Sequence, residues 1–243
     1  MLNIINSEWI RTRSLVGTWV MLGFAFVFIS VPSLFLLSYY LGEFGWEEPF
    51  VSVTSVLLGS LPALLVIVCL SAVRVSSARN HNLHAQSFLV IKARWSQLAA
   101  SMVVNVLLSV VTVVVGIAAA LAILTIAPQP LNFDYGSVLV WLVAIAAMLS
   151  LIGSSLGVII PSTAGAVCLP LVWMVVEQIL PTFSRFLGEF VVPYLPVTNM
   201  FWLINPELAA ATHGSATSGI ILALWTGLLM AAAFYVNESR DVK

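Results

Sequence analysis

Arg74–Trp95 reads RVSSARNHNLHAQSFLVIKARW and separates two long apolar runs. It contains Arg74, Arg79, Lys92 and Arg94, four of the nine basic residues of the chain, and no Asp or Glu. A short basic segment between two membrane spans stays on the cytoplasmic side. The sequence therefore predicts a cytoplasmic surface here, at which a membrane protein contacts a soluble partner.

The composition on both sides of this segment is that of a membrane protein. Of the 243 residues, 61% are hydrophobic and 8% are charged, whereas soluble domains carry roughly 25% charged residues. Apolar runs longer than about 18 residues recur, and each could cross a hydrocarbon core of roughly 30 Å. The runs are continuously apolar, which favours helices over a membrane barrel. A net charge of −1 gives no indication of nucleic-acid binding.

We expect a single all-α transmembrane domain over residues 1–243, with six spans. The expected spans cover about 15–41, 50–73, 98–127, 136–160, 164–180 and 217–236. With this count only Arg185 lies outside, and both chain ends are cytoplasmic. The other eight bases lie inside: Arg11, Arg13, Arg74, Arg79, Lys92, Arg94, Arg240 and Lys243.

Two segments outside the spans have patterns of their own. In residues 2–13, Leu2, Ile5 and Trp9 recur at helical spacing, which predicts an amphipathic interface helix on the cytoplasmic face. Residues 181–215 are apolar and aromatic but are interrupted by prolines. Such a segment cannot cross as one helix, so we expect a broken external hairpin of two short helices.

Polar and small residues within the spans are candidates for packing or for a substrate path. Gly153 and Gly157 indicate close helix packing. Asn105 and the pair Glu177-Gln178 are candidates for a path or gate, because polar groups at membrane depth need a partner. Ordinary helix packing is the alternative for Asn105. For Glu177 the alternative is a carboxylate that reaches the interface or pairs with Arg185.

Catalytic and metal motifs are weak. Residues 153–157 match G-x-S-x-G, but that motif needs a strand, a sharp turn and a helix. His81 and His84 have no Cys, Asp or Glu beside them to complete a metal site. No phosphate-binding G-x-x-x-x-G-K-[ST] loop occurs. We expect no enzyme activity, no metal and no cofactor on this chain itself.

The layout as a whole resembles the ABC type-2 permeases, the membrane subunits of many bacterial ATP-binding-cassette exporters. Four segments are similar to that family, and together they extend over nearly the full chain: Ser7–Ser14 as the opening, Ile160–Pro181 with its Thr-Ala-Gly entry as the fifth span, Tyr194-Leu195-Pro196 in the external element, and Arg240-Asp241-Val242 in the tail.

The resemblance implies a multi-pass subunit of the bacterial cytoplasmic (inner) membrane, surrounded by lipid, that moves a drug, lipid or antimicrobial peptide outward. It implies two cytoplasmic ABC ATPase subunits, which hold ATP and Mg, and a second permease chain, identical or related. Residues 74–95 would couple to the ATPase through Arg74, Arg79, His81, Asn82, His84 and Gln86. Trp9, Arg11 and Arg13 would belong to the interface helix.

Two further observations bear on this assignment. The coupling loop has Ala78 and Asn82-Leu83 where many members of the family have an acidic residue and a Gly-Thr pair. Few charges lie in the spans, which favours a hydrophobic or amphipathic substrate over an ion or a sugar. The alternative function is a non-transporting membrane protein of the same fold, such as an immunity, sensor or assembly subunit.

Overall fold

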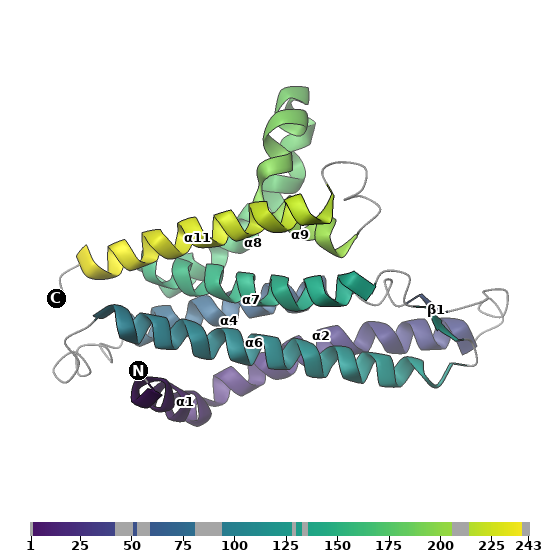
Figure 1. Cartoon of the computed structure of the whole chain (residues 1–243), viewed down its shortest axis with the longest axis horizontal. Helices are drawn as coiled ribbons and strands as arrows, with labels where there is room; N and C mark the ends of the chain where they lie inside the picture. Colours follow the sequence, from purple (N-terminus) through teal and green to yellow (C-terminus); the bar gives the residue numbers. More distant parts are fainter. Residues whose placement is uncertain are drawn as a thin grey trace.

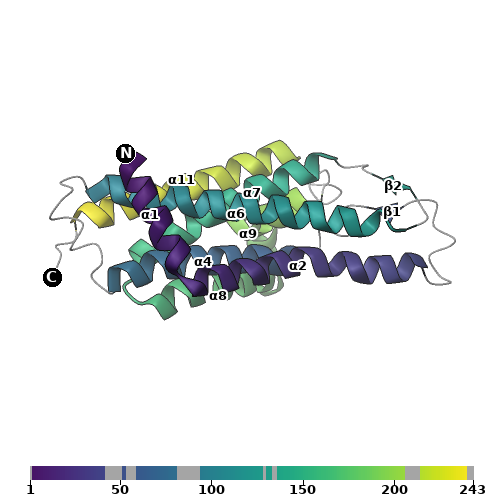
Figure 2. The ribbon, with the colours of Figure 1, turned by 90° about the horizontal axis from the view of Figure 1, so that it is seen from below.

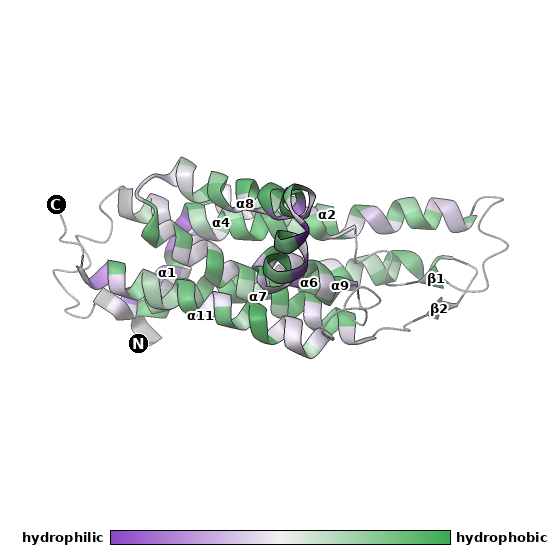
Figure 3. Ribbon diagram, turned by 90° about the horizontal axis from the view of Figure 1, so that it is seen from above, coloured by the Kyte–Doolittle hydropathy of each residue, from purple (hydrophilic) through white to green (hydrophobic). Residues whose placement is uncertain are grey.

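The structure is a computed structural model, and it describes residues 2–41, 51–52, 59–80, 94–127, 130–132, 136–205 and 214–239. Six of its helices are long and apolar enough to cross a membrane, or seven spans if one bent pair counts as one more. The six are α2 (Val16–Leu41), α4 (Leu61–Asn80), α6 (Arg94–Leu124), α7 (Gly136–Ile159), α8 (Thr163–Phe183) and α11 (Ser215–Ser239). The chain is thus a largely helical, multi-pass membrane protein, and hydrophobic residues run along most of the length of these helices (Figure 3).

The helices lie roughly along one axis, and the first helix crosses one end of the bundle. Helix α1 (Leu2–Ser14) lies across that end and packs on α6 (Figure 2). The end of α11 lies at the same end of the molecule (Figure 1). We call it the α1 end.

A short strand pair lies at the opposite end. Strand β1 (Val51–Ser52) pairs in parallel with β2 (Leu131–Asn132), and Val51 N–H donates to the Pro130 carbonyl at 2.9 Å (Figure 2). The start of the predicted second span therefore meets the connection between the predicted third and fourth spans.

The second span differs from its predicted boundaries of 50–73. Helix α4 begins at Leu61, after a turn at Gly59-Ser60, and continues to Asn80. The Ser60 carbonyl accepts from Ala63 N–H at 2.9 Å. Ser60 followed closely by Pro62 is a helix-start signal, because proline fits the first turn, where no intrahelical N–H bond is lost. The apolar residues before it belong partly to β1, so hydrophobicity alone placed the start too early.

The predicted close packing of span four is present against α4. A Cβ on Gly153 would clash with the Val68 carbonyl oxygen, and one on Gly157 would lie 2.5 Å from the Ala72 carbonyl oxygen. Close backbone approach of this kind stabilises helix pairs in lipid. The G-x-S-x-G match lies inside α7, and the Ser155 hydroxyl donates to the Leu151 carbonyl of its own helix at 2.8 Å.

Six helices contribute buried side chains to the main core. Its buried side chains come from α2, α4, α6, α7, α9 (Pro196–Ile204) and α11, and include Ile29, Ile67, Val113, Ile145, Ile204 and Leu222. Among the described residues, α8 contributes no buried member to this core. Helix α8 packs on α4, while many of its apolar side chains are exposed.

The segment after α8 consists of short helices; the sequence predicted a broken hairpin over residues 181–215, of which residues 181–183 belong to α8. The π-helix η2 (Leu187–Val191) and the 3-10 helix η3 (Val192–Tyr194) together make an angle of 78° with α9. The end of α8 and η2 rise away from the bundle, and α9 returns to pack beside α11 (Figure 1). Residues 206–213 of the predicted hairpin lie outside the described residues.

Candidate functional site

Glu177 of α8 is buried, with 1% of its surface exposed, and it accepts hydrogen bonds from α8 and α9. Its Oε2 accepts from Thr198 N–H at 2.8 Å and from the Thr198 hydroxyl at 3.2 Å. Its Oε1 accepts from the Trp173 indole N–H at 2.5 Å and from Val197 N–H at 3.3 Å. The carboxylate thus fixes the start of α9 to the middle of α8.

This arrangement compensates for a helix start that has no cap of its own. The N-cap of α9 is Leu195, whose side chain makes no capping bond, and Pro196 follows. First-turn amides lack intrahelical partners, and a negative charge at a helix N-terminus is favourable. Glu177 supplies both the acceptor and the charge from a neighbouring helix.

The alternative roles considered for Glu177 are wrong. The side chain does not reach outward, and Arg185 instead forms an exposed ion pair with Glu189, at 2.6 Å between Nε and Oε1. Gln178, its sequence neighbour, is exposed. A path or gate role remains a proposal for Glu177.

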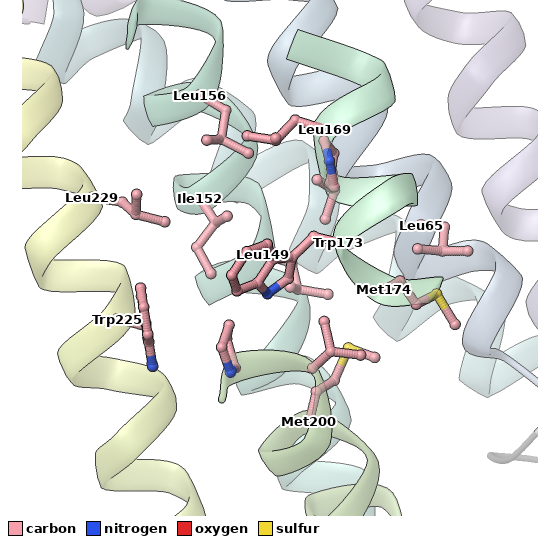
Figure 4. Close-up of a pocket in the computed structure, with 14 residues that line it drawn as sticks. Leu65, Leu149, Ile152, Leu156, Leu169, Trp173, Met174, Met200, Trp225 and Leu229 are labelled. Carbon is pink, nitrogen blue, oxygen red and sulfur yellow. The ribbon is translucent and has the colours of Figure 1, made fainter. Parts of the chain in front are cut away.

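An apolar pocket of about 220 Å³ lies next to this carboxylate. In the close-up, α11 is on one side and α8 on the other, with α7 behind and α9 across the lower part (Figure 4). Glu177 and the pocket share Trp173 and Val197. The lining residues are Leu65, Val68, Leu149, Ile152, Leu156, Leu169, Pro170, Trp173, Met174, Pro196, Val197, Met200, Trp225 and Leu229.

Two more hydrogen bonds hold the α9 side of the pocket. The Trp225 indole N–H donates to the Tyr194 carbonyl at 2.8 Å, which ties α11 to η3. The Asn199 side-chain amide donates to the carbonyls of Pro193 and Leu195 at 2.8 and 2.7 Å. The bend between η3 and α9 is therefore fixed on several sides.

A second polar cluster joins α1 to the bundle. Arg74 Nη2 of α4 donates to the Thr12 hydroxyl of α1, and the Arg11 guanidinium pairs with Glu8 at 3.0 Å. Glu8, Thr12 and Arg74 are all buried. Burial raises the pKa of Glu8 above its ordinary value, although Arg11, Arg74 and a hydrogen bond from Gln97 of α6 lower it in part.

The remaining predicted residues are placed separately. In the predicted interface helix, Trp9 and Arg13 are exposed, Glu8 and Thr12 are buried, and Ile5 packs on a core cluster that includes Leu22. Asn105 donates to the Ser154 hydroxyl of α7 at 2.8 Å, a packing contact away from the pocket. Most of the predicted coupling segment lies outside the described residues. This includes the side chain of Arg79 and all of His81, Asn82, His84 and Gln86.

Sequence reasoning missed the partners of Glu177. Trp173 lies four residues before Glu177, a spacing that puts the two side chains on one helix face, so this contact could have been found. Thr198 and Trp225 gave no such signal, because their partners are 21 and 31 residues away in the sequence.

No family model matches the chain, and no curated protein matches it.

Proposed function

We propose that the chain is the membrane-spanning permease subunit of an ATP-driven exporter, as its resemblance to the ABC type-2 permeases implies. The chain supplies the path through the cytoplasmic membrane, and separate ATPase subunits hydrolyse ATP with Mg. A second permease chain completes the transporter. The substrate is hydrophobic or amphipathic, in keeping with the apolar pocket beside Glu177.

One observation carries the proposal: α1 is joined to the point where the coupling segment begins. Thr12 of α1 accepts from Arg74, the first residue of that segment, and both are buried. Helix α1 also packs on α6, which begins where the segment ends. Helix α1 and the described ends of the coupling segment, to which the resemblance assigns ATPase contact, therefore lie together at the α1 end.

Charge supports the same orientation. Arg11, Arg13 and Arg74 lie at the α1 end, and Arg185 lies in the broken segment that follows α8. By the positive-inside rule the α1 end is cytoplasmic, and the strand pair and the broken segment face outward.

The packing offers a route from the α1 end to the pocket. Helix α4 is locked to α7 through Gly153 and Gly157, and it also packs on α8. Helix α8 holds α9 through Glu177. A displacement of α4 by a docked ATPase would therefore move walls of the pocket, because membrane helices keep their hydrogen bonds internal and move as rigid units.

The first test is co-purification of the detergent-solubilised chain from its native host. An ATPase with a phosphate-binding loop, recovered in roughly equal amount, supports the proposal. A second six-span chain beside it would make the permease pair heteromeric. Repeated recovery without any ATPase contradicts it and favours the non-transporting alternative.

A variant series makes the test specific to the coupling segment. Joint replacement of Arg79, His81, Asn82 and His84 by Ala should lower both ATPase recovery and transport-coupled ATP hydrolysis, with membrane insertion unchanged. The matched control is Arg185→Ala, an exposed base outside the coupling segment whose loss should change neither. Full coupling in the four-residue variant would refute the assigned docking surface.

A further inference from the structure

The pocket between α8 and α11 has no free polar group on the side chains of its wall. All fourteen lining residues are apolar or tryptophan. The two indole N–H groups are already used, Trp173 by Glu177 and Trp225 by the Tyr194 carbonyl. A polar ligand group buried here would lose its hydrogen bonds to water without replacement, which is costly. The wall therefore selects a pure hydrocarbon group.

The depth of the pocket points to the same chemistry. Trp173 is the central residue of α8 (Thr163–Phe183), and Trp225 and Leu229 flank the centre of α11 (Ser215–Ser239). In a hydrocarbon core of roughly 30 Å, the middle of a span lies about 15 Å from either headgroup layer. Only the tail of a lipid reaches that depth.

The pocket opens onto an exposed apolar face of α8. Leu169 and Trp173 line it and are nevertheless 44% and 38% exposed. Their neighbours Val172 and Val176 are exposed on the same helix. The pocket is therefore continuous with an apolar surface that, in a membrane, contacts lipid chains.

The volume fits one chain segment. A dry apolar cavity of about 150 Å³ can hold a benzene molecule, so 220 Å³ accommodates roughly eight carbon atoms. That is about half of a common fatty-acyl chain and too little for a folded peptide segment.

We propose that this pocket binds the terminal half of one acyl chain of a membrane phospholipid, which enters along α8 and is held between Trp173 and Trp225. The site lies within one chain, so it does not depend on the transport proposal. The lipid headgroup stays at the membrane surface and contributes nothing to selection at the pocket.

The test is lipid retention by the purified full chain, measured by native mass spectrometry after extraction from vesicles of phosphatidylethanolamine and phosphatidylglycerol. The wild-type chain should retain one phospholipid, whichever headgroup it carries. Leu229→Phe adds a ring at the pocket wall and should lower this occupancy about tenfold. Leu228→Phe, on the exposed face of the same helix, is the matched control and should keep it.

A second measurement detects bound lipid without a substitution that fills the pocket. Phospholipid brominated near the chain end is added to the chain in detergent, because bromine quenches nearby tryptophan. Quenching should saturate at one lipid per chain, and Trp225→Phe should remove part of it. Trp19→Phe, at an exposed position of α2 that does not line the pocket, should leave the saturable part intact.

Three results would overturn the proposal. They are equal lipid retention in Leu229→Phe and Leu228→Phe, retention that depends on one headgroup, and quenching that rises without saturation. Quenching that a candidate export substrate relieves, but an added unbrominated phospholipid does not, would assign the pocket to the exported amphiphile instead.

Discussion

Replacement of Glu177 by Ala removes four hydrogen-bond acceptor contacts at one point. The donors left behind are the Trp173 indole, the backbone N–H groups of Val197 and Thr198, and the Thr198 hydroxyl. The hydroxyl can turn to another acceptor, but the two amides are fixed by the first turn of α9. Helix α9 then begins with no side-chain cap at all.

The size of the effect follows from these groups. A buried donor left unpaired costs about 1–3 kcal/mol, and loss of a helix cap costs about 1 kcal/mol. Removal of a buried carboxylate recovers part of this, because burying a charge is itself unfavourable. We expect a net loss of about 2–4 kcal/mol in the local stability of α9, which corresponds to roughly 30- to 1,000-fold faster amide exchange. Glu177→Gln keeps one acceptor oxygen and should lose about half as much.

Hydrogen–deuterium exchange of the purified chain in detergent, read at the α9 peptide and at an α7 peptide, measures this directly. Exchange should rise in α9 and stay unchanged in α7. Glu189→Ala is the matched control, because it removes only an exposed ion pair, of the kind that contributes little. The capping role would be refuted if α9 exchanged at the wild-type rate in Glu177→Ala.

Three further predictions concern the helix seam and the α1 cluster. Gly153→Ala should lower thermal stability by about 1–3 kcal/mol because its Cβ meets the Val68 carbonyl, whereas Gly227→Ala, with nothing within 4 Å, should not; equal effects would argue against the seam. Because the pKa of Glu8 is raised in the folded chain, its contribution to stability is complete below pH 4.5 and is lost as the pH rises through the raised pKa. Thermal unfolding of the wild-type chain and of Glu8→Gln across this pH range should show the loss in the wild-type chain only. A stability difference between the two chains that does not change with pH would contradict the prediction. Arg74→Leu should make α1 more sensitive to proteolysis, because it leaves Glu8 buried without the Arg74 cation. Adding Glu8→Leu should restore most of the resistance of α1 to proteolysis. If the losses of resistance in the two single variants simply add in the double variant, Glu8 and Arg74 are not energetically coupled.

The fold class and most spans could be predicted from the sequence because they depend on local composition. A run of about 20 apolar residues has to be helical in lipid, whatever its neighbours, since its backbone must satisfy its own hydrogen bonds. The predicted spans 15–41 and 136–160 accordingly match α2 and α7 within one residue at each end. The predicted start of span two was wrong, because Val51-Ser52 form a strand and α4 begins only at Leu61.

The small residues of span four were recognisable as a packing face, but their partner was not. The sequence shows two glycines four residues apart, and only the structure shows that they meet the backbone of α4 near Val68 and Ala72. The same holds for Asn105, whose need for a partner was evident and whose partner, Ser154, was not.

Glu177 shows most clearly which part of the site could be predicted from the sequence and which part required the tertiary structure. A carboxylate in an apolar run indicates by itself that some compensating group exists, because an isolated buried charge is too costly. It does not indicate which group. Arg185 is eight residues away and opposite in charge, yet the acceptor is satisfied by the amides of Val197 and Thr198. Those amides are available only because the chain bends by 78° before α9 and brings an uncapped helix start against α8. Local hydrophobicity determined the spans. The pocket beside Glu177 depends on hydrogen bonds between polar groups that are distant in the sequence, and only the packing of the helices decided which of these groups pair.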